Sequence, residues 1–289
     1  MAIRVLLLLS LPVLVLGAEV NQIAVDRFLP NKVALYVANA DGTNERPLLQ
    51  QSSNLDYNGA YSADGKSIVF TSERDGSSEL YKVKSDGTGI ERLTDNIAYD
   101  DQAFFSPDGR RIVFVSTRDG GHSNLWILDV ATRKATRLTN GLWSDLRPSW
   151  SPNGQWIAFS SDRETPYVNV TGRWEQLNLL KIWMIKPDGT GLRQLTDTDG
   201  ACGSPKWSRD GQRLIAYCMG PAETFTNRFP QPQPDKTWLI SIDVPTGKET
   251  RVASGPGTQM SPAFIGTNTI GYVRKDGTNE RGIYYLNPA

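Results

Sequence analysis

The stretch Phe105-Ser-Pro-Asp-Gly-Arg-Arg-Ile-Val-Phe-Val-Ser116 decides the fold, because close copies of it recur along the chain. Its Ser-Pro-Asp-Gly core is typical of a tight turn, since proline presets the backbone angle φ and glycine accepts a left-handed conformation. The Ile-Val-Phe run that follows is built from residues that favour β-strands. The stretch therefore predicts a hairpin with one strand ending at an aromatic residue and the next strand starting after the turn.

The copies are evenly spaced over most of the chain. Their aligned serines are separated by 44, 45 and 57 residues, and a degenerate fifth copy covers Phe264 to Val273. A period near 45 residues that contains only strand signals is typical of propeller blades. The aligned serines are Ser62, Ser106, Ser151 and Ser208.

Each repeat continues with two further strand signals. An alternating segment such as Leu125-Trp-Ile-Leu128 follows, then in two repeats an Asp-Gly hairpin turn at Asp86 or Asp188, then a segment ending in Arg-Leu-Thr or Gln-Leu-Thr. No stretch shows sustained helical periodicity. The sequence therefore predicts an all-β fold, in which residues 19–289 form a single β-propeller of four-stranded antiparallel blades.

The two ends match the repeat only in part. Residues 23–49 resemble strands two to four of a blade that lacks its first strand, and residues 262–286 resemble strands one to three of a blade that lacks its fourth. We count six blade-like units and expect six blades. Five blades is the alternative, if the N-terminal strands merge with the last blade.

The recurring words Ser-Pro-Asp-Gly, Ile-Val-Phe, Ser-Thr-Arg-Asp-Gly, Leu-Trp and Arg-Leu-Thr resemble the TolB-type, WD40-like propeller repeat, and the resemblance covers Ile23 to Pro288. It implies the propeller fold and, as in the propeller domain of periplasmic TolB, docking of other proteins. Similar repeats form the propellers of prolyl oligopeptidase-like peptidases and of some oligouronide lyases. This chain has no Gly-x-Ser-x-Gly nucleophile motif and a single histidine, so neither enzyme's residue set is carried over.

Composition excludes several function classes. Lysine plus arginine and aspartate plus glutamate both number 31, so the net charge is zero, which excludes nucleic acid as the main partner and a polybasic membrane-surface protein. One histidine and two cysteines exclude an all-protein Cys/His zinc site. Apart from a possible calcium ion, we expect no cofactor, and we expect a monomer.

The N-terminus is typical of a signal peptide. Residues 1–18 combine Arg4, an apolar run from Val5 to Leu16, and the small residues Gly17 and Ala18. The run is short for a bilayer span, and no second apolar span follows. We therefore expect a secreted or periplasmic protein with no integral membrane segment after cleavage.

An exported protein can form disulfides. Cys202 and Cys218 flank the predicted turn at Ser208–Gly211 almost symmetrically, which would place them opposite each other in a hairpin. The sequence favours a disulfide, with two free buried thiols as the alternative.

Two insertions lengthen neighbouring repeats on one face. Both Glu164–Asn178 and Pro221–Lys236 fall between strands two and three, and loops on a rigid scaffold often carry function. Their aromatic and arginine side chains suit a protein or carbohydrate partner, although the insertions could instead pack as Ω-loops. The first insertion also contains the sequon Asn169-Val-Thr, a glycosylation site in a eukaryotic secreted protein. The candidate binding residues are Tyr167, Arg173, Trp174, Phe225, Arg228 and Phe229.

Aspartates recur on the same face. Asp56, Asp100 and Asp145 each stand six residues before an aligned serine, with Asp101 and Arg147 close by. Three carboxylates around the channel mouth could recruit calcium. The alternative is that each aspartate caps the backbone of its own inter-blade loop, which aspartate does well.

The function prediction is an exported propeller that binds a protein or carbohydrate through the insertion face. The alternative is a polysaccharide lyase or glycosidase that uses the channel-mouth carboxylates. In that enzyme His122 would be the base, Arg147 would neutralise a uronate carboxylate and Tyr167 would donate a proton.

Overall fold

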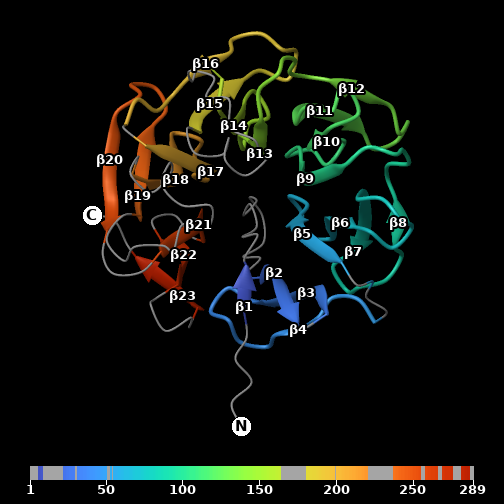
Figure 1. Ribbon diagram of the computed structural model, residues 1–289. Coiled ribbons are helices and arrows are strands. Elements are labelled where there is room, and N and C mark those ends of the chain that lie inside the picture. Colours follow the sequence, from blue (N-terminus) through green and yellow to red (C-terminus); the bar gives the residue numbers. More distant parts are fainter. Residues whose placement is uncertain are drawn as a thin grey trace.

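The computed structural model describes residues 6–8, 22–29, 31–50, 53, 55–163, 180–198, 200–220, 237–254, 258–265, 269–275 and 281–286. The regular elements in these residues are all strands, arranged as antiparallel sheets around one axis (Figure 1). The predicted all-β propeller is confirmed. Within the described residues no helix could cross a membrane.

The first sheet contains β1 (Leu6–Leu8), β2 (Gln22–Leu29), β3 (Lys32–Asn39) and β4 (Arg46–Pro47). The second contains β5 (Asp56–Tyr61), β6 (Ser67–Ser72), β7 (Glu79–Lys84) and β8 (Glu91–Arg92). The third contains β9 (Asp100–Phe105), β10 (Arg111–Ser116), β11 (Asn124–Asp129) and β12 (Ala135–Arg137). The fourth contains β13 (Asp145–Trp150), β14 (Ile157–Ser161), β15 (Lys181–Ile185) and β16 (Arg193–Gln194). The fifth contains β17 (Ala201–Trp207), β18 (Arg213–Met219), β19 (Thr237–Asp243) and β20 (Glu249–Ser254), and the sixth contains β21 (Thr258–Phe264), β22 (Ile270–Lys275) and β23 (Arg281–Leu286).

Five sheets are complete four-stranded blades, the number of the alternative prediction, and the sixth keeps three strands, as expected for a unit without its fourth. The terminal strands do not merge into one sheet. The missing first strand of the N-terminal blade comes instead from Leu6–Leu8, which pairs with the open edge of β2. These residues lie inside the predicted signal peptide, which stays a prediction.

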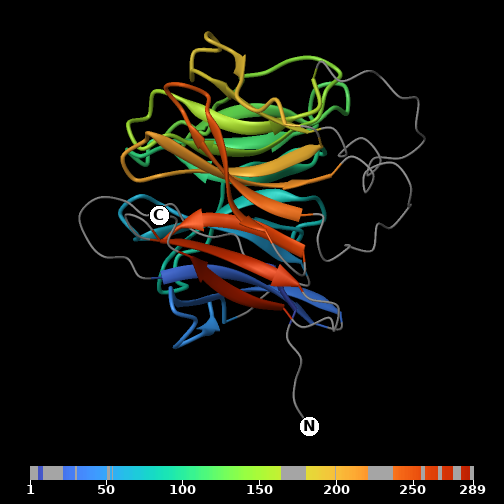
Figure 2. The same cartoon turned by 90° about the vertical axis from the view of Figure 1, so that its left-hand side faces the viewer.

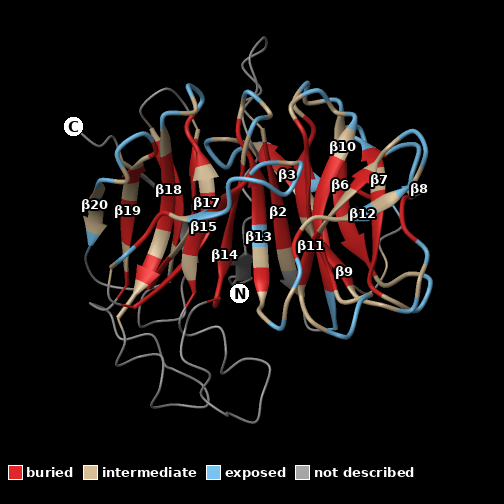
Figure 3. Cartoon of the chain, turned by 90° about the horizontal axis from the view of Figure 1, so that it is seen from above, coloured by how far each residue is buried: buried red, intermediate tan, exposed pale blue. Residues whose placement is uncertain are grey.

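The first and sixth sheets pack against each other and close the ring. Ile23 and Val25 of β2 share a buried cluster with Ala263 and Val273 of the C-terminal sheet. In the side view of Figure 2 the red C-terminal strands accordingly lie beside the blue N-terminal strands. Figure 3 shows that the strands are buried along their middles, while exposed residues gather in the turns. Each buried cluster in the described part of the chain likewise draws on at least two neighbouring blades.

Hydrogen bonds explain why the repeated words recur. In the third blade the Ser106 hydroxyl donates to Asp108 at 2.5 Å and accepts from the Arg111 N–H at 2.9 Å, while Gly109 adopts a φ of +69°. The Ser-x-Asp-Gly turn thus depends on its serine, aspartate and glycine, and the turns at Ser62, Ser151 and Ser208 form the same serine bonds. Hydrogen bonds from the Ser106 hydroxyl and the Arg110 N–H lower the pKa of Asp108, although burial opposes them.

The Arg-Leu-Thr word joins the fourth strand to the third. The Thr139 hydroxyl accepts a hydrogen bond from the Leu125 N–H at 2.9 Å, and Arg137 Nε donates to the Thr139 carbonyl at 2.8 Å. Thr94 and Thr196 make the same hydroxyl contact in the second and fourth blades. The word therefore satisfies backbone groups at the outer edge of each of these blades.

The predicted disulfide is confirmed. Cys202 of β17 and Cys218 of β18 are directly opposite each other, with their Cα atoms 4.1 Å apart, and they are bonded. Both are buried. The bond therefore fastens the innermost hairpin of the fifth blade.

Removing this bond should destabilise the propeller. The cysteines are 16 residues apart, so the bond reduces the chain entropy of the unfolded state by an amount worth about 3 kcal/mol. The double variant Cys202→Ala/Cys218→Ala should lose roughly that free energy of unfolding in a denaturant titration. A reducing agent should weaken the wild type and leave the variant unchanged, and equal stabilities under oxidising conditions would contradict the bond.

Candidate functional site

The three aspartates predicted to ring the rim each lie in a contact set within their own blade. Asp145, at the start of β13, accepts a hydrogen bond from the Ser161 hydroxyl at 2.5 Å, and both of its carboxylate oxygens accept from Arg163 at 2.6 Å. Arg163 Nε also donates to the Ser161 hydroxyl at 2.9 Å. We call this aspartate, serine and arginine a clamp, because it joins the first strand of a blade to the end of the second.

The clamp repeats in the two preceding blades. Arg118 binds Asp100 at 2.5 Å and Ser116 at 2.9 Å, and Arg74 binds Asp56 and Ser72, both at 2.9 Å. All three aspartates are fully buried. A buried carboxylate needs such compensation, because transfer of a charge out of water is costly.

Aromatic rings hold the clamp arginines in place. The guanidinium carbon of Arg163 lies 5.2 Å from the centre of the Phe159 ring and 5.3 Å from that of Trp183. Phe159 belongs to the second strand of the blade and Trp183 to the third, so the clamp joins three strands. Arg118 lies between Phe114 and Trp126, and Arg74 lies between Phe70 and Tyr81.

The fifth blade places its disulfide where the other blades place the aspartate and the serine. Cys202 pairs with Cys218 in the register in which Asp145 pairs with Ser161. The spacing of Asp56, Asp100, Asp145 and Cys202 therefore marks one position in successive blades. At this position the hairpin is fastened either by charge or by a covalent bond.

The capping alternative fits Asp56, which accepts from the backbone of its own inter-blade loop, whereas Asp100 accepts from a side chain of its loop. Asp56 accepts from the Ser53 N–H at 2.8 Å, and Asp100 accepts from Asn96 Nδ2 at 2.8 Å, both from the connection that leads into the strand. Within the described residues no three His, Cys, Asp or Glu side chains form a group that could hold a metal ion. We therefore propose no metal at the clamps.

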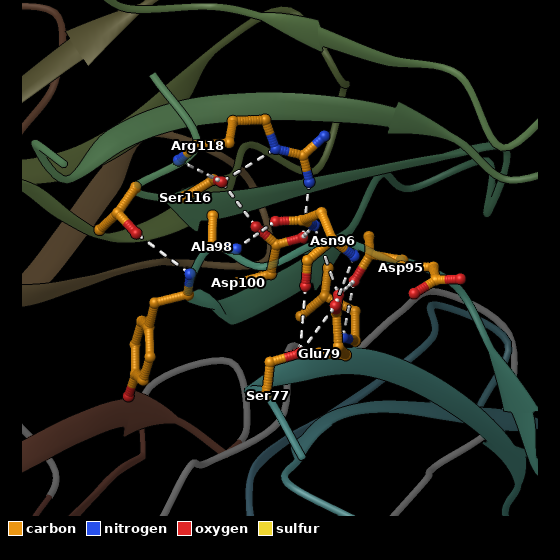
Figure 4. Close-up of polar contacts among 12 residues, drawn as sticks. Ser77, Glu79, Asp95, Asn96, Ala98, Asp100, Ser116 and Arg118 are labelled. Carbon is orange, nitrogen blue, oxygen red and sulfur yellow. Dashed lines mark hydrogen bonds and ion pairs between the residues drawn. The ribbon is translucent and has the colours of Figure 1, made fainter. Parts of the chain in front are cut away.

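A second buried carboxylate, Glu79, joins the second blade to the third (Figure 4). Glu79 begins β7 and accepts from the Thr94 hydroxyl at 2.5 Å and from the Asn96 N–H at 2.6 Å. Asn96 then bridges to Asp100. Burial raises the pKa of Asp100 and the nearby Glu79 adds to this, while Ser116, Arg118 and Asn96 oppose it. Sequence reasoning missed Glu79, because the carboxylate does not repeat. The same register position holds Asn124, Lys181 and Trp238 in the next three blades.

A chain of polar contacts crosses the inner strands from blade to blade. Asn58 donates to Asp101 at 2.7 Å, and Gln102 accepts from the Arg147 N–H at 2.7 Å. Arg147 Nη1 then donates to the hydroxyls of Ser204 and Tyr217 at 2.8 and 2.7 Å. We call these contacts the axial chain, because they follow the strands nearest the propeller axis.

Bulges in five of the inner strands create the axial chain. The register of β5, β9, β13, β17 and β21 shifts at this point, and the residue there adopts a positive φ although it is not glycine. A bulge redirects a side chain, and the left-handed backbone costs on the order of 1 kcal/mol per residue. The residues are Asn58, Gln102, Arg147, Ser204 and Ser261.

Asp101, predicted as a binding residue, is a buried hub of this chain. Its carboxylate accepts from Asn58, from the Thr71 hydroxyl at 2.8 Å and from the Gln102 N–H at 2.6 Å. Tyr99 donates to it at 3.3 Å. Asp101 therefore positions neighbouring blades, whereas Arg147 is exposed.

The axial chain is acidic at one end and basic at the other. Asp26 of β2 accepts from the Asn58 N–H at 3.1 Å, and burial raises its pKa to about 7, with Asp101 adding to the shift. Asp26 Oδ1 has no hydrogen-bond partner in the described part of the chain. At the other end, burial and then repulsion from Arg147 lower the pKa of Lys206 to about 7.

The remaining predicted residues divide into two groups. His122 is half-buried in the loop before β11, and its carbonyl accepts from Asn124 Nδ2 at 3.2 Å. The described contacts do not join His122 to Arg147. The two insertions lie outside the described residues, and so do the predicted Tyr167, Asn169, Arg173, Trp174, Phe225, Arg228 and Phe229.

Removing a clamp arginine should be costly. Arg163→Met keeps an unbranched apolar side chain between Phe159 and Trp183 but leaves Asp145 buried without its cation, so we expect a loss of about 3–5 kcal/mol in the free energy of unfolding. Urea denaturation measures it. The matched control is Arg110→Met in an exposed turn, with an expected change within about 0.5 kcal/mol. Equal losses in the two variants would show that the clamp does not stabilise the blade.

Asp26 should make stability depend on pH. The pKa of Asp26 is about 7 in the folded protein and 3.8 when unperturbed, so folding favours the protonated carboxyl. Its contribution to the free energy of unfolding is therefore complete below pH 4 and is lost as the pH rises through 7. Asp26→Asn removes this dependence. Between pH 4 and pH 8, the free energy of unfolding of the variant should therefore rise relative to that of the wild type by on the order of 4 kcal/mol. Denaturation of both proteins across this range measures the gain, and a difference independent of pH would contradict it.

Comparison with known proteins agrees with this architecture. The family model PD40, TolB beta propeller domain, matches residues 100–168. The Tol-Pal system protein TolB of Francisella tularensis subsp. holarctica (strain OSU18) is 27% identical over 266 residues, which are 88% of this chain and 55% of that protein. This chain spans between 14% and 55% of the length of the first curated relatives that it matches.

Solved structures show the same fold. TolB from Acinetobacter baumannii superposes with a TM-score of 0.72 at 19% identity, over 94% of this chain and 62% of that one. An oligogalacturonate lyase in complex with manganese superposes with a TM-score of 0.61 at 15% identity, over 99% of this chain and 82% of that one. At such identities the likeness concerns the fold alone. The repeats, the sheet arrangement and these matches together make the chain a TolB-like β-propeller.

Proposed function

We propose that this protein is a periplasmic binding module that docks a protein partner at the rim where the inner strands begin. The observation that carries the proposal is the geometry of Arg147. Its side chain is exposed, yet Ser204 and Tyr217 of the neighbouring blade hold its guanidinium in one orientation. Arginine is enriched among the residues that dominate protein interfaces, and a preoriented side chain loses less entropy on binding.

The clamps favour binding over catalysis. The carboxylates that the enzyme alternative would use, Asp56, Asp100 and Asp145, are each buried and paired with an arginine of their own blade. A general acid or base must instead reach the substrate with a pKa near the working pH. Within the described residues these aspartates therefore serve the scaffold.

The likeness to TolB supports the same proposal. The Francisella relative is named as a component of the Tol–Pal system, and it aligns with 88% of this chain. Docking of a partner protein is what the propeller repeat implies. The periplasmic location rests on the predicted signal peptide and on the disulfide, because disulfides persist in oxidising compartments.

Affinity capture with charge-reversal variants tests the proposal. The immobilised protein should capture a partner from a cell-envelope extract, and the purified partner should then bind Arg147→Glu at least tenfold more weakly than it binds the wild type. The matched control is Arg209→Glu, an exposed arginine in the turn that follows β17, at the opposite end of the inner strands. This control should bind normally.

A polysaccharide panel tests the alternative function. Reducing ends and ultraviolet-absorbing unsaturated products should both stay at background. Turnover of any polysaccharide that His122→Ala abolishes would overturn the binding-module proposal. A partner that binds the Arg147→Glu and Arg209→Glu variants equally would place the docking surface elsewhere.

A further inference from the structure

Two cations at the basic end of the axial chain have no anionic partner. Arg74, Arg118 and Arg163 each pair with a buried aspartate, whereas no ion pair of the described residues involves Arg147 or Lys206. Lys206 lies in β17, next to the blade of Arg147, and its ammonium stands 4.0 Å from the centre of the Phe104 ring. Arg111 and Lys181 are also half-buried and form no ion pair in the described part of the chain, but Lys181 donates to backbone carbonyls and Arg111 lies over the Trp150 ring. What sets Arg147 and Lys206 apart is that their two charges repel each other.

The groups around the pair offer mainly donors. Arg147 uses Nη1 for Ser204 and Tyr217, and both hydroxyls accept from it, so each keeps its own proton available. The guanidinium has Nε and Nη2 donors left, and the Lys206 ammonium has three. A planar carboxylate accepts several such hydrogen bonds and supplies the missing negative charge.

We propose that Arg147 and Lys206, with the hydroxyls of Ser204 and Tyr217, form a binding site for a carboxylate group of an acidic peptide. The inference deepens the proposed function, on which it rests for the peptide source of the carboxylate. The recognition chemistry stands on contacts of the described residues. Arg147 binds both hydroxyls, Lys206 follows Ser204 by two residues in β17, and its ammonium lies over the Phe104 ring and is repelled by Arg147.

Burial and the neighbouring Arg147 disfavour the charged form of Lys206, so an anion should be taken up together with a proton. Burial and Arg147 hold the pKa of Lys206 near 7, and a bound carboxylate would favour the ammonium form. Affinity should therefore fall as the pH rises from 6 to 8.

The strands β14 and β21, which pack on β17, carry no ionisable side chain. The ionisable groups of the other strands in contact with β17 or Lys206 are Asp100, Asp101, Asp145, Arg147, Lys181, Arg213 and Tyr217.

Calorimetric titration with a hexaglutamate peptide tests the site. The wild type should bind the peptide at pH 6, and Lys206→Met should weaken binding at least tenfold and remove the change in affinity between pH 6 and pH 8. Methionine preserves the apolar contact with Phe104. The matched control is Lys66→Met, an exposed lysine in the turn after β5, which should bind as the wild type does.

Four further outcomes decide the proposal. Lys206→Met should unfold at the same or a higher denaturant concentration than the wild type, because it removes a partly buried unpaired cation, so lost binding would not reflect misfolding. Equal hexaglutamate binding by the wild type and Lys206→Met would overturn the site. Tight binding of hexagalacturonate without binding of hexaglutamate would overturn the peptide source and assign the site to a uronate. Lys206-dependent binding of hexaglutamate would support the site even if affinity capture found no dependence on Arg147, so the two proposals can fail separately.

Discussion

The propeller depends on how each blade fastens its innermost hairpin. The first strand of a blade borders the axis and has one neighbouring strand in its own sheet, so it needs a further attachment. Three blades supply it with a buried aspartate that binds an arginine from the end of the second strand. Removing either partner alone would leave a charge in a site closed to water, which explains why aspartate, serine and arginine occur together. The fifth blade achieves the same attachment with Cys202 and Cys218.

The sequence predicted the features that repeat within one blade. Ser-x-Asp-Gly and Arg-Leu-Thr form hydrogen bonds over a few residues or across one hairpin, so their spacing is visible in a single chain. The same holds for Asp56, Asp100 and Asp145, whose positions were found although their arginine partners were not. The arginines were missed because Ser-Thr-Arg-Asp-Gly reads as a turn, and turn composition does not indicate which buried group an arginine reaches.

Contacts between blades could not be predicted in this way. Arg147 binds Tyr217, which is 70 residues away, and Lys206 contacts Phe104 from another blade. No repeat links these residues, because the axial position holds asparagine, glutamine, arginine or serine in successive blades. The blade period identifies the position but not its chemistry. The first strand of the N-terminal blade was missed for a related reason, since the apolar composition of Leu6–Leu8 fits both a leader and a strand.

One of the strained positions, Arg147, also carries a charge that no described carboxylate pairs with. Five inner strands, β5, β9, β13, β17 and β21, each hold a non-glycine residue at positive φ, a conformation that persists only where the surroundings enforce it. At Asn58 and Gln102 the gain is clear, because these residues link the first four blades. Asn58 donates its N–H to Asp26 and its side-chain amide to Asp101, and Gln102 accepts from the Arg147 N–H. At Arg147 the same bulge instead presents a cation that the fold leaves without a carboxylate. Scaffold contacts alone do not account for that choice, since a neutral side chain could bind Ser204 and Tyr217 without adding repulsion to Lys206. The choice of arginine at this position and the repulsion that it adds are both explained if the missing carboxylate belongs to a partner.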